Sequence, residues 1–364
     1  MTVTLGQSDH PGPSASIQSP GYTFRMKIAP DVAPKNDANT LGLSYRDEAA
    51  RLPYRGPIWD VHNHIHSLEA ARLFFQVADL FNIERIWTMA PLELVDDLKS
   101  EFGPRIQFIA VPNYEKKDDP QTFTTDWMHR IEKFREKGCR IAKLWAAPRG
   151  RDFSDALTLD SPLRQGGIKL AHDLGMMFMT HVSDPDTWFA TKYADSKKYG
   201  TKAQQYEPLH KLLDQYGDVP WIAAHMAGDP EHLDHLQAML DRHPNLYLDT
   251  SATKWMVREL SKKPDELRDF CVRNSGRVLF GSDIVANTVD MSFDLYASRW
   301  WALRTMFETN HDGPSPIVDP DLNMVDPTVA KDATAWLRGA NLDAATLKMV
   351  YHGAAVNLLT PWIA

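Results

Sequence analysis

The stretch PIWDVHNH, residues 57–64, combines a strand pattern with two histidines on one face. Its first five residues are mainly apolar or β-branched, which predicts a β-strand. Because side chains alternate between the two faces of a strand, His62 and His64 point the same way, about 6 to 7 Å apart along the backbone. Two such imidazoles can chelate one metal ion. His66 keeps the same alternation, so a pair of His64 and His66 is the competing register; we favour His62 and His64 because they lie nearer the predicted strand and follow Asp60.

Short apolar runs recur along the chain and alternate with amphipathic helical patterns. The predicted strands are 57–61, 85–89, 106–111, 140–145, 176–180, 221–224, 245–249 and 278–280. The predicted helices between them are 68–81, 126–137, 162–174, 208–216, 230–243 and 264–274. Eight nearly continuous apolar strands that alternate with helices predict an α/β protein with a parallel (β/α)8 TIM barrel.

The chain divides where this alternation begins. Residues 1–54 are rich in Pro, Ser, Gly and Asp without periodicity, which predicts an irregular N-terminal arm, flexible or wrapping. Within it, residues 22–26 could dock on the body or on a neighbouring subunit. Residues 55–364 form the barrel domain, a size that single barrels reach. The segments longer than ordinary connections are 146–161, 184–207 and 284–340. They follow strand ends where barrel enzymes place active sites, so we expect lids, substrate contacts or oligomer contacts there.

Composition and net charge limit the kinds of partner and the cellular compartment that we expect. The net charge of -8 argues against a nucleic-acid or anionic-membrane surface. Cys139 and Cys271 lack a metal-type spacing, which excludes a disulfide framework and favours a reducing cytoplasm. The first 21 residues lack the basic start and apolar core of a signal peptide, and no stretch approaches the length of a membrane span. We therefore expect a cytoplasmic protein that acts on a small molecule.

Three more potential metal ligands lie at the ends of later predicted strands. His181 directly follows the fifth strand, His225 follows the sixth, and Asp283 lies just beyond the eighth. The carboxyl ends of all strands meet at one mouth of a barrel, so closure would bring these side chains to His62 and His64. One such histidine is more often structural, but their coincidence at four strand ends predicts a metal site.

These motifs resemble those of the amidohydrolase superfamily. They are DVHNH (60–64), TH (180–181), AAHMAG (223–228) and LFGSD (279–283). The resemblance is greatest to the amidohydrolase-related branch, also called amidohydrolase 2, which contains the aminocarboxymuconate semialdehyde decarboxylase-like enzymes. The C-terminal YHGAAVNLL, 351–359, is similar to the closing helix of that branch, except that Ala354-Ala355 replaces the usual Asn-Ala. The resemblance covers residues 57–362 and implies a TIM barrel of the metal-dependent hydrolase type.

The resemblance also implies roles for the strand-end residues. It implies metal ligands at His62, His64, His181 and Asp283. Neutral imidazoles and a carboxylate suit one divalent transition metal, zinc before manganese or iron. Asp283 and His225 are then the catalytic residues. Asp283 would take a proton from a water and pass it to the leaving group, and His225 would orient a carbonyl or stabilise its charge. A packed, non-catalytic histidine is the alternative for His225.

Lys143, in the fourth predicted strand, leaves the number of metals open. Binuclear members of the superfamily carry a carboxylated lysine here that bridges two metals, with His181 and His225 on the second ion. The closer branch often has an ordinary lysine, so we favour one metal and a Lys143 that pairs with a substrate carboxylate; an ion pair within the barrel is the structural alternative. Further candidates for substrate binding are Arg149, Arg151, Trp145, Trp255 and Asn287. Asp249, at the end of the seventh strand, is a candidate hydrogen-bond partner for a histidine.

These residues favour a metal-dependent hydrolase that activates water to cleave an amide, lactone or ester of a small carboxylate-bearing molecule. The alternative is a non-oxidative, metal-dependent decarboxylase, a carboxy-lyase, acting on an aromatic or semialdehyde carboxylic acid. The two share almost every ligand and differ in whether a carbonyl beside water or a carboxylate beside a proton donor is held. A non-catalytic barrel is disfavoured by the intact ligand set. Analogy with the family predicts a homo-oligomer.

Overall fold

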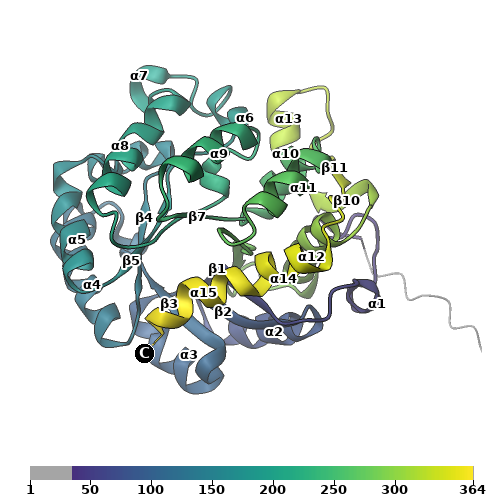
Figure 1. The fold of residues 1–364 in the computed structure, drawn as a ribbon, viewed down its shortest axis with the longest axis horizontal. Helices are drawn as coiled ribbons and strands as arrows, with labels where there is room; N and C mark the ends of the chain where they lie inside the picture. The colour runs from purple at the N-terminus through teal and green to yellow at the C-terminus, as the bar shows by residue number, and fades with distance from the viewer. Residues whose placement is uncertain (1–34, 364) are drawn as a thin grey trace, which may run out of the picture. The chain divides into compact units, whose positions relative to one another are not determined.

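The computed structural model describes residues 35–363 and contains a nine-stranded parallel sheet (Figure 1). The strands are β1 (Ile58–Ile65), β2 (Ile83–Met89), β3 (Ile106–Ala110), β4 (Ile141–Trp145), β5 (Met177–His181), β6 (Trp221–Ala223), β7 (Leu246–Asp249), β8 (Val278–Leu279) and β9 (Ile284–Ala286). Their order is β8-β7-β6-β5-β4-β3-β2-β1-β9. All eight predicted strands are present, although β1 continues through the two histidines instead of ending before them.

The two outermost strands in this order are consecutive pieces of one chain segment. β8 pairs with β7, and β9 pairs with β1. Between these pieces, Val61 N donates to Phe280 O at 2.9 Å and Asp283 N donates to His62 O at 2.8 Å. The segment 278–286 therefore contacts both the seventh and the first strand, as the eighth strand of a (β/α)8 barrel does. The predicted fold class is confirmed.

Helices lie around the outside of the strands (Figure 1). They are α1 (Tyr45–Arg51), α2 (Leu68–Leu80), α3 (Val95–Phe102), α4 (Thr125–Glu136), α5 (Pro162–Asp173), α6 (Asp186–Phe189), α7 (Ser196–Tyr199), α8 (Lys202–Gln215), α9 (Leu233–Arg242), α10 (Thr253–Leu260), α11 (Pro264–Arg273), α12 (Phe293–Glu308), α13 (Asp321–Val325), α14 (Ala344–Lys348) and α15 (Ala354–Leu359). α2 shows why they form: Ser67 caps its first turn, and Phe74 and Val77 bury its inner face in the core around the strands.

Two predictions about the elements need correction, the start of one helix and the nature of one long connection. The helix predicted at 208–216 begins at Lys202, because Thr201 and Gln204 form a capping box and Pro208 lies inside the helix. The segment 284–340, predicted as a long connection, contains β9, α12, α13 and a hairpin of β10 (Asp312–Val318) and β11 (Thr334–Arg338). α12 escaped detection because it is buried on nearly all sides, so its sequence carries little amphipathic periodicity.

The described part of the predicted N-terminal arm packs on the barrel domain. α1 buries Tyr45 and Ala49, and the Tyr45 ring meets Trp301 of α12 edge-on at 6.4 Å. The Thr40 N–H donates to Pro316 O of β10 at 2.9 Å. The docking segment predicted at 22–26 lies outside the described residues.

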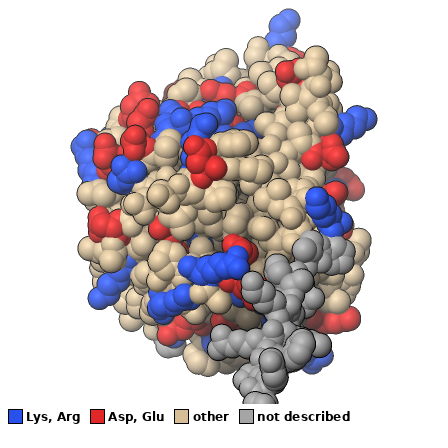
Figure 2. All heavy atoms as spheres, turned by 90° about the vertical axis from the view of Figure 1, so that its right-hand side faces the viewer, with Lys and Arg blue, Asp and Glu red and all other residues tan. Residues whose placement is uncertain are grey.

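Two further features concern binding partners: the distribution of charged side chains on the surface, and the length and hydropathy of the helices. On the face shown in Figure 2, basic and acidic side chains lie interspersed rather than gathered in one large patch of a single sign. Within residues 35–363, the helices include none that is both long and apolar enough to cross a membrane.

Candidate active site

His62 is held from behind by a buried carboxylate. Its Nδ1 lies 2.8 Å from Asp249 Oδ2, and the exposed fractions of the two side chains are 1% and 0%. Burial, followed by the charge of Lys143, lowers the pKa of His62, so the ring is neutral near pH 7. The N–H on Nδ1 therefore donates to Asp249, and Nε2 keeps its lone pair. The predicted bond between Asp249 and a histidine is confirmed.

Asp283 meets both histidines of β1. Its Oδ1 lies 3.4 Å from His62 Nε2 and 3.2 Å from His64 Nε2. Its backbone is left-handed, with φ 57°, while its N–H donates to His62 O. Burial opposes ionisation of Asp283, but the hydrogen bond from His64, together with the other histidines around the carboxylate, outweighs burial and lowers its pKa. The Asp283 side chain is therefore a carboxylate that faces the lone pair of His62.

The structure separates His66 from this cluster. The ligand atoms of His62, His64 and Asp283 lie within 4.8 Å of one another, and His66 belongs to no such group among the residues described. Its ring stacks on His64 with centroids 6.1 Å apart and lines a neighbouring cavity. The geometry thus favours the register of His62 and His64.

His225 shares Asp249 with His62. The His225 N–H donates to Asp249 Oδ1 at 2.9 Å, and its Nδ1 lies 2.7 Å from Ser251 Oγ. The ring centroids of His225 and His62 are 4.8 Å apart. Burial lowers the pKa of His225 well below its usual value, so this ring is also neutral. Ser251, which lies two residues beyond the end of β7, belongs to no motif and was not predicted.

His181 lies beside His225 but has a carboxylate partner of its own. The two ring centroids are 4.5 Å apart. His181 Nε2 lies 2.8 Å from Asp184 Oδ1, and the Tyr193 hydroxyl donates to Asp184 Oδ2 at 2.6 Å. His181 lines the same cavity as the other predicted ligands, although it is in none of the tight His and carboxylate groups among the described residues. Asp184 was not predicted; its spacing three residues beyond His181 was the available signal.

Lys143 points into the same cluster. Its Nζ lies 3.4 Å from His62 Nε2, and its side chain is buried. Burial lowers the pKa of Lys143 to about 8, with Asp249 and Asp283 acting in the opposite direction. Within residues 35–363, Lys143 forms no direct salt bridge, although the charges of Asp249 and Asp283 favour its ammonium form.

One cavity of about 410 Å³ joins most of the predicted site residues. Its lining residues are His62, His64, Met89, Tyr114, Lys117, Lys143, Trp145, Arg149, Phe153, His181, His225, Trp255 and Asp283. Tyr114 and Lys117 were missed, because no metal-binding side chain marks the end of the third strand. Arg151 lines a neighbouring cavity instead. Asn287 also lies elsewhere, and its side chain accepts from Val289 N and Asp290 N at 2.8 Å.

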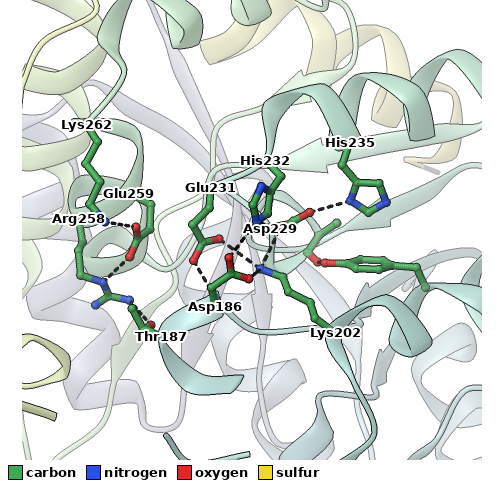
Figure 3. Close-up of polar contacts among 12 residues, drawn as sticks. Asp186, Thr187, Lys202, Asp229, Glu231, His232, His235, Arg258, Glu259 and Lys262 are labelled. Atoms are coloured by element: carbon green, nitrogen blue, oxygen red, sulfur yellow. Dashed lines mark hydrogen bonds and ion pairs between the residues drawn. The ribbon is translucent and has the colours of Figure 1, made fainter. Parts of the chain in front are cut away.

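An ion-pair network fastens the segment after β5 (Figure 3). The Lys202 ammonium lies 2.7 Å from both Asp186 Oδ1 and Asp229 Oδ1 and 3.3 Å from Glu231 Oε2. His232 Nε2 lies 2.8 Å from Asp186 Oδ2. Asp186, Asp229 and His232 also form a compact His and carboxylate group, but the Lys202 ammonium already lies among its carboxylates. The network joins the two ends of residues 186–202 to the loop after β6.

The fold and these strand-end side chains agree with a family match. The family model described as "Amidohydrolase" matches residues 71–359, and the chain belongs to this family. The match includes His181, His225 and Asp283 and begins after β1.

Solved structures provide further comparisons. The chain is similar to dihydroorotase from Saccharomyces cerevisiae, with 12% identity over 69% of this chain and 78% of that chain and a TM-score of 0.44. It is also similar to uronate isomerase from Thermotoga maritima, with 12% identity over 78% of this chain and 69% of that chain and a TM-score of 0.39. No curated protein matches the chain.

Proposed function

We propose that this protein is a metal-dependent hydrolase that cleaves an amide, lactone or ester of a small carboxylate-bearing molecule. The convergence of His62 Nε2 and His64 Nε2 on Asp283 Oδ1 carries this proposal. The lone pair of His62 faces a carboxylate oxygen, so two acceptors meet at a position where both could bind a metal ion, with the Lys143 ammonium 3.4 Å from the same His62 nitrogen. Neutral imidazoles with a carboxylate fit one divalent transition metal, zinc before manganese or iron. His62, His64, His181 and Asp283 would hold it.

The residues of the chain then have separate tasks. When bound, the metal supplies a Lewis acid that polarises a carbonyl and makes a water molecule more acidic. Asp283 accepts the proton of the attacking water and returns it to the leaving group. His225, held by Ser251 and by the Asp249 carboxylate, orients the carbonyl or stabilises its developing charge.

Cationic and aromatic side chains of the cavity select the substrate. Lys143 pairs with the substrate carboxylate next to the metal position, and Arg149 offers a second cation on the cavity wall. Trp145 and Trp255 line the cavity and give a planar substrate two aromatic surfaces. Arg151 and Asn287 remain predictions for substrate contacts, from positions outside this lining.

The state of Lys143 decides between one and two metals. We favour an unmodified lysine and one ion. With its pKa near 8, part of the lysine is the free amine at neutral pH, the form that can react with carbon dioxide to give a carbamate. A carbamate would add a second metal on His181 and His225. Metal analysis and the intact mass of the purified protein distinguish the two: one equivalent with no added mass supports our proposal.

The same aromatic and cationic lining also suits decarboxylation of an aromatic or semialdehyde acid. The deciding experiment offers the metal-loaded protein a panel of lactones, amides, esters and aromatic acids and records hydrolysis and carbon dioxide release together. We expect hydrolysis without carbon dioxide release. Carbon dioxide release from an acid without hydrolysis of any panel member would replace the hydrolase with the carboxy-lyase.

We further propose that the protein is cytoplasmic and forms a homo-oligomer. Both cysteines are free and buried, which supports a reducing compartment. The family resemblance is the support for an oligomer. Light scattering coupled to gel filtration measures the particle mass, and a mass equal to one chain would contradict the oligomer.

A further inference from the structure

We propose that Asp184 and Tyr193 are positioning residues for His181, and that they make metal affinity depend on the segment between β5 and α8. This inference rests on the proposed metal site. It assigns His181 Nδ1, rather than Nε2, to the metal. Neither Asp184 nor Tyr193 lines the active-site cavity, so each acts through the histidine.

Hydrogen-bond roles fix the form of the His181 ring. Asp184 is 1% exposed and Tyr193 is 3% exposed, so water does not compete for their contacts. The Tyr193 hydroxyl donates to Asp184 Oδ2, and the oxygens of a carboxylate accept hydrogen bonds. His181 Nε2, 2.8 Å from Asp184 Oδ1, must therefore carry the proton that it donates. In a neutral ring the lone pair then lies on Nδ1, which has no hydrogen-bond partner within the described part of the chain.

His62 and His181 are each held by a carboxylate, but through opposite ring nitrogens. Asp249 accepts from Nδ1 of His62 and leaves Nε2 for the cluster, whereas Asp184 accepts from Nε2 of His181 and leaves Nδ1. A carboxylate that fixes the outer nitrogen of a ligand histidine sets both its tautomer and its orientation. His181 is in none of the tight ligand groups, so the orientation of its ring decides whether Nδ1 reaches the metal position.

Tyr193 links the support of His181 to the packing of the segment between β5 and α8. Its ring packs against Phe189 and Tyr199 with centroid distances of 5.3 and 4.9 Å. An ion pair joins the two ends of the segment: Lys202 Nζ lies 2.7 Å from Asp186 Oδ1 (Figure 3). The hydroxyl that holds Asp184 is therefore placed by residues between two anchored ends, and loosening the segment would loosen His181.

The test measures metal affinity rather than turnover. Zinc affinity of the full chain is determined by competition with a chromophoric chelator, and the absorption spectrum of the cobalt-loaded protein reports the ligand geometry. Tyr193→Phe removes one hydroxyl and keeps the ring. Asp184→Asn replaces the carboxylate by an amide. The amide presents either an N–H donor or a weaker acceptor oxygen to His181 Nε2. Tyr199→Phe is the matched control, because it removes a hydroxyl from the same aromatic cluster that donates instead to Asp152 Oδ1 at 2.9 Å.

We expect Asp184→Asn and Tyr193→Phe to weaken zinc binding by roughly 10- to 100-fold and to change the cobalt spectrum, as loss of an outer partner of a ligand histidine does. Tyr199→Phe should bind zinc like the wild type. If both variants keep wild-type affinity and spectrum while His181→Ala weakens binding, the positioning inference is overturned and the ligand set stands. If His181→Ala itself keeps wild-type affinity, His181 is not a ligand, and both this inference and the proposed ligand set are wrong.

Discussion

Asp249 Oδ2 lies 2.8 Å from Nδ1 of His62 in the candidate active site. The other oxygen of this carboxylate accepts from the His225 backbone N–H. One buried side chain thus fixes both the ring nitrogen that His62 presents and the turn that carries His225.

Replacing Asp249 tests this arrangement. Asp249→Asn keeps the shape of the side chain but removes the charge that holds the proton on Nδ1, so we expect zinc affinity to fall roughly 10- to 100-fold. A matched control is Asp218→Asn, since Asp218 contacts His172 at 2.9 Å on the surface. Equal zinc affinity of the two variants would show that Asp249 does not support a metal ligand.

The two registers of the first motif give a second prediction. His64→Ala should lose metal, because it removes a nitrogen 3.2 Å from Asp283 Oδ1. His66→Ala should retain metal within a few-fold, because His66 stacks on His64 but is in no group of ligand atoms among the described residues. Metal content after gel filtration distinguishes these variants, and the reverse pattern would assign the site to His64 and His66.

Lys143 provides a kinetic prediction. If it pairs with a substrate carboxylate, Lys143→Met should raise KM strongly while one equivalent of metal remains bound. An exposed lysine, Lys169, gives the control substitution Lys169→Met, which should leave KM unchanged. Loss of metal from Lys143→Met would instead support the carbamate bridge.

The lowered pKa of Lys143 also predicts the pH dependence of stability. The Lys143 side chain is buried in the folded chain, where its ammonium loses its proton near pH 8. In the unfolded chain the same group loses its proton near pH 10.5. The folded state therefore binds fewer protons between these values, and this group's contribution to stability rises with pH across that window. In metal-free protein at pH 7, Lys143→Met should raise the free energy of unfolding by on the order of 3 kcal/mol. Urea denaturation at pH 7 and pH 10 checks this: the gain should shrink at the higher pH, and a gain that does not change with pH would contradict the assignment.

The sequence could predict those strands and site residues that a local residue pattern marks. Each predicted strand is a short apolar run, and each of His62, His181, His225 and Asp283 lies where such a run ends or just after it. Convergence then follows from barrel topology rather than from sequence proximity.

What sequence missed depends on contacts between segments. Burial on nearly all sides removed the periodicity that would have revealed α12. Ser251 and Tyr114 belong to no motif, and their places beside the candidate site become visible only when the strand ends are brought together. Arg151 was selected for its charge, but the loop after β4 turns its side chain towards another cavity.

We propose that His62, His64 and Asp283 build a metal site that the activity requires. The most direct measurement is the metal content of wild-type protein and of His62→Ala and Asp283→Ala, with circular dichroism as the check on folding and hydrolysis as the readout of activity. We predict about one equivalent in the wild type and less than about a tenth of an equivalent, with no hydrolysis, in both folded variants. A wild type that holds almost no transition metal and gains no activity with zinc or manganese, or an Asp283→Ala variant with wild-type turnover, would contradict the claim.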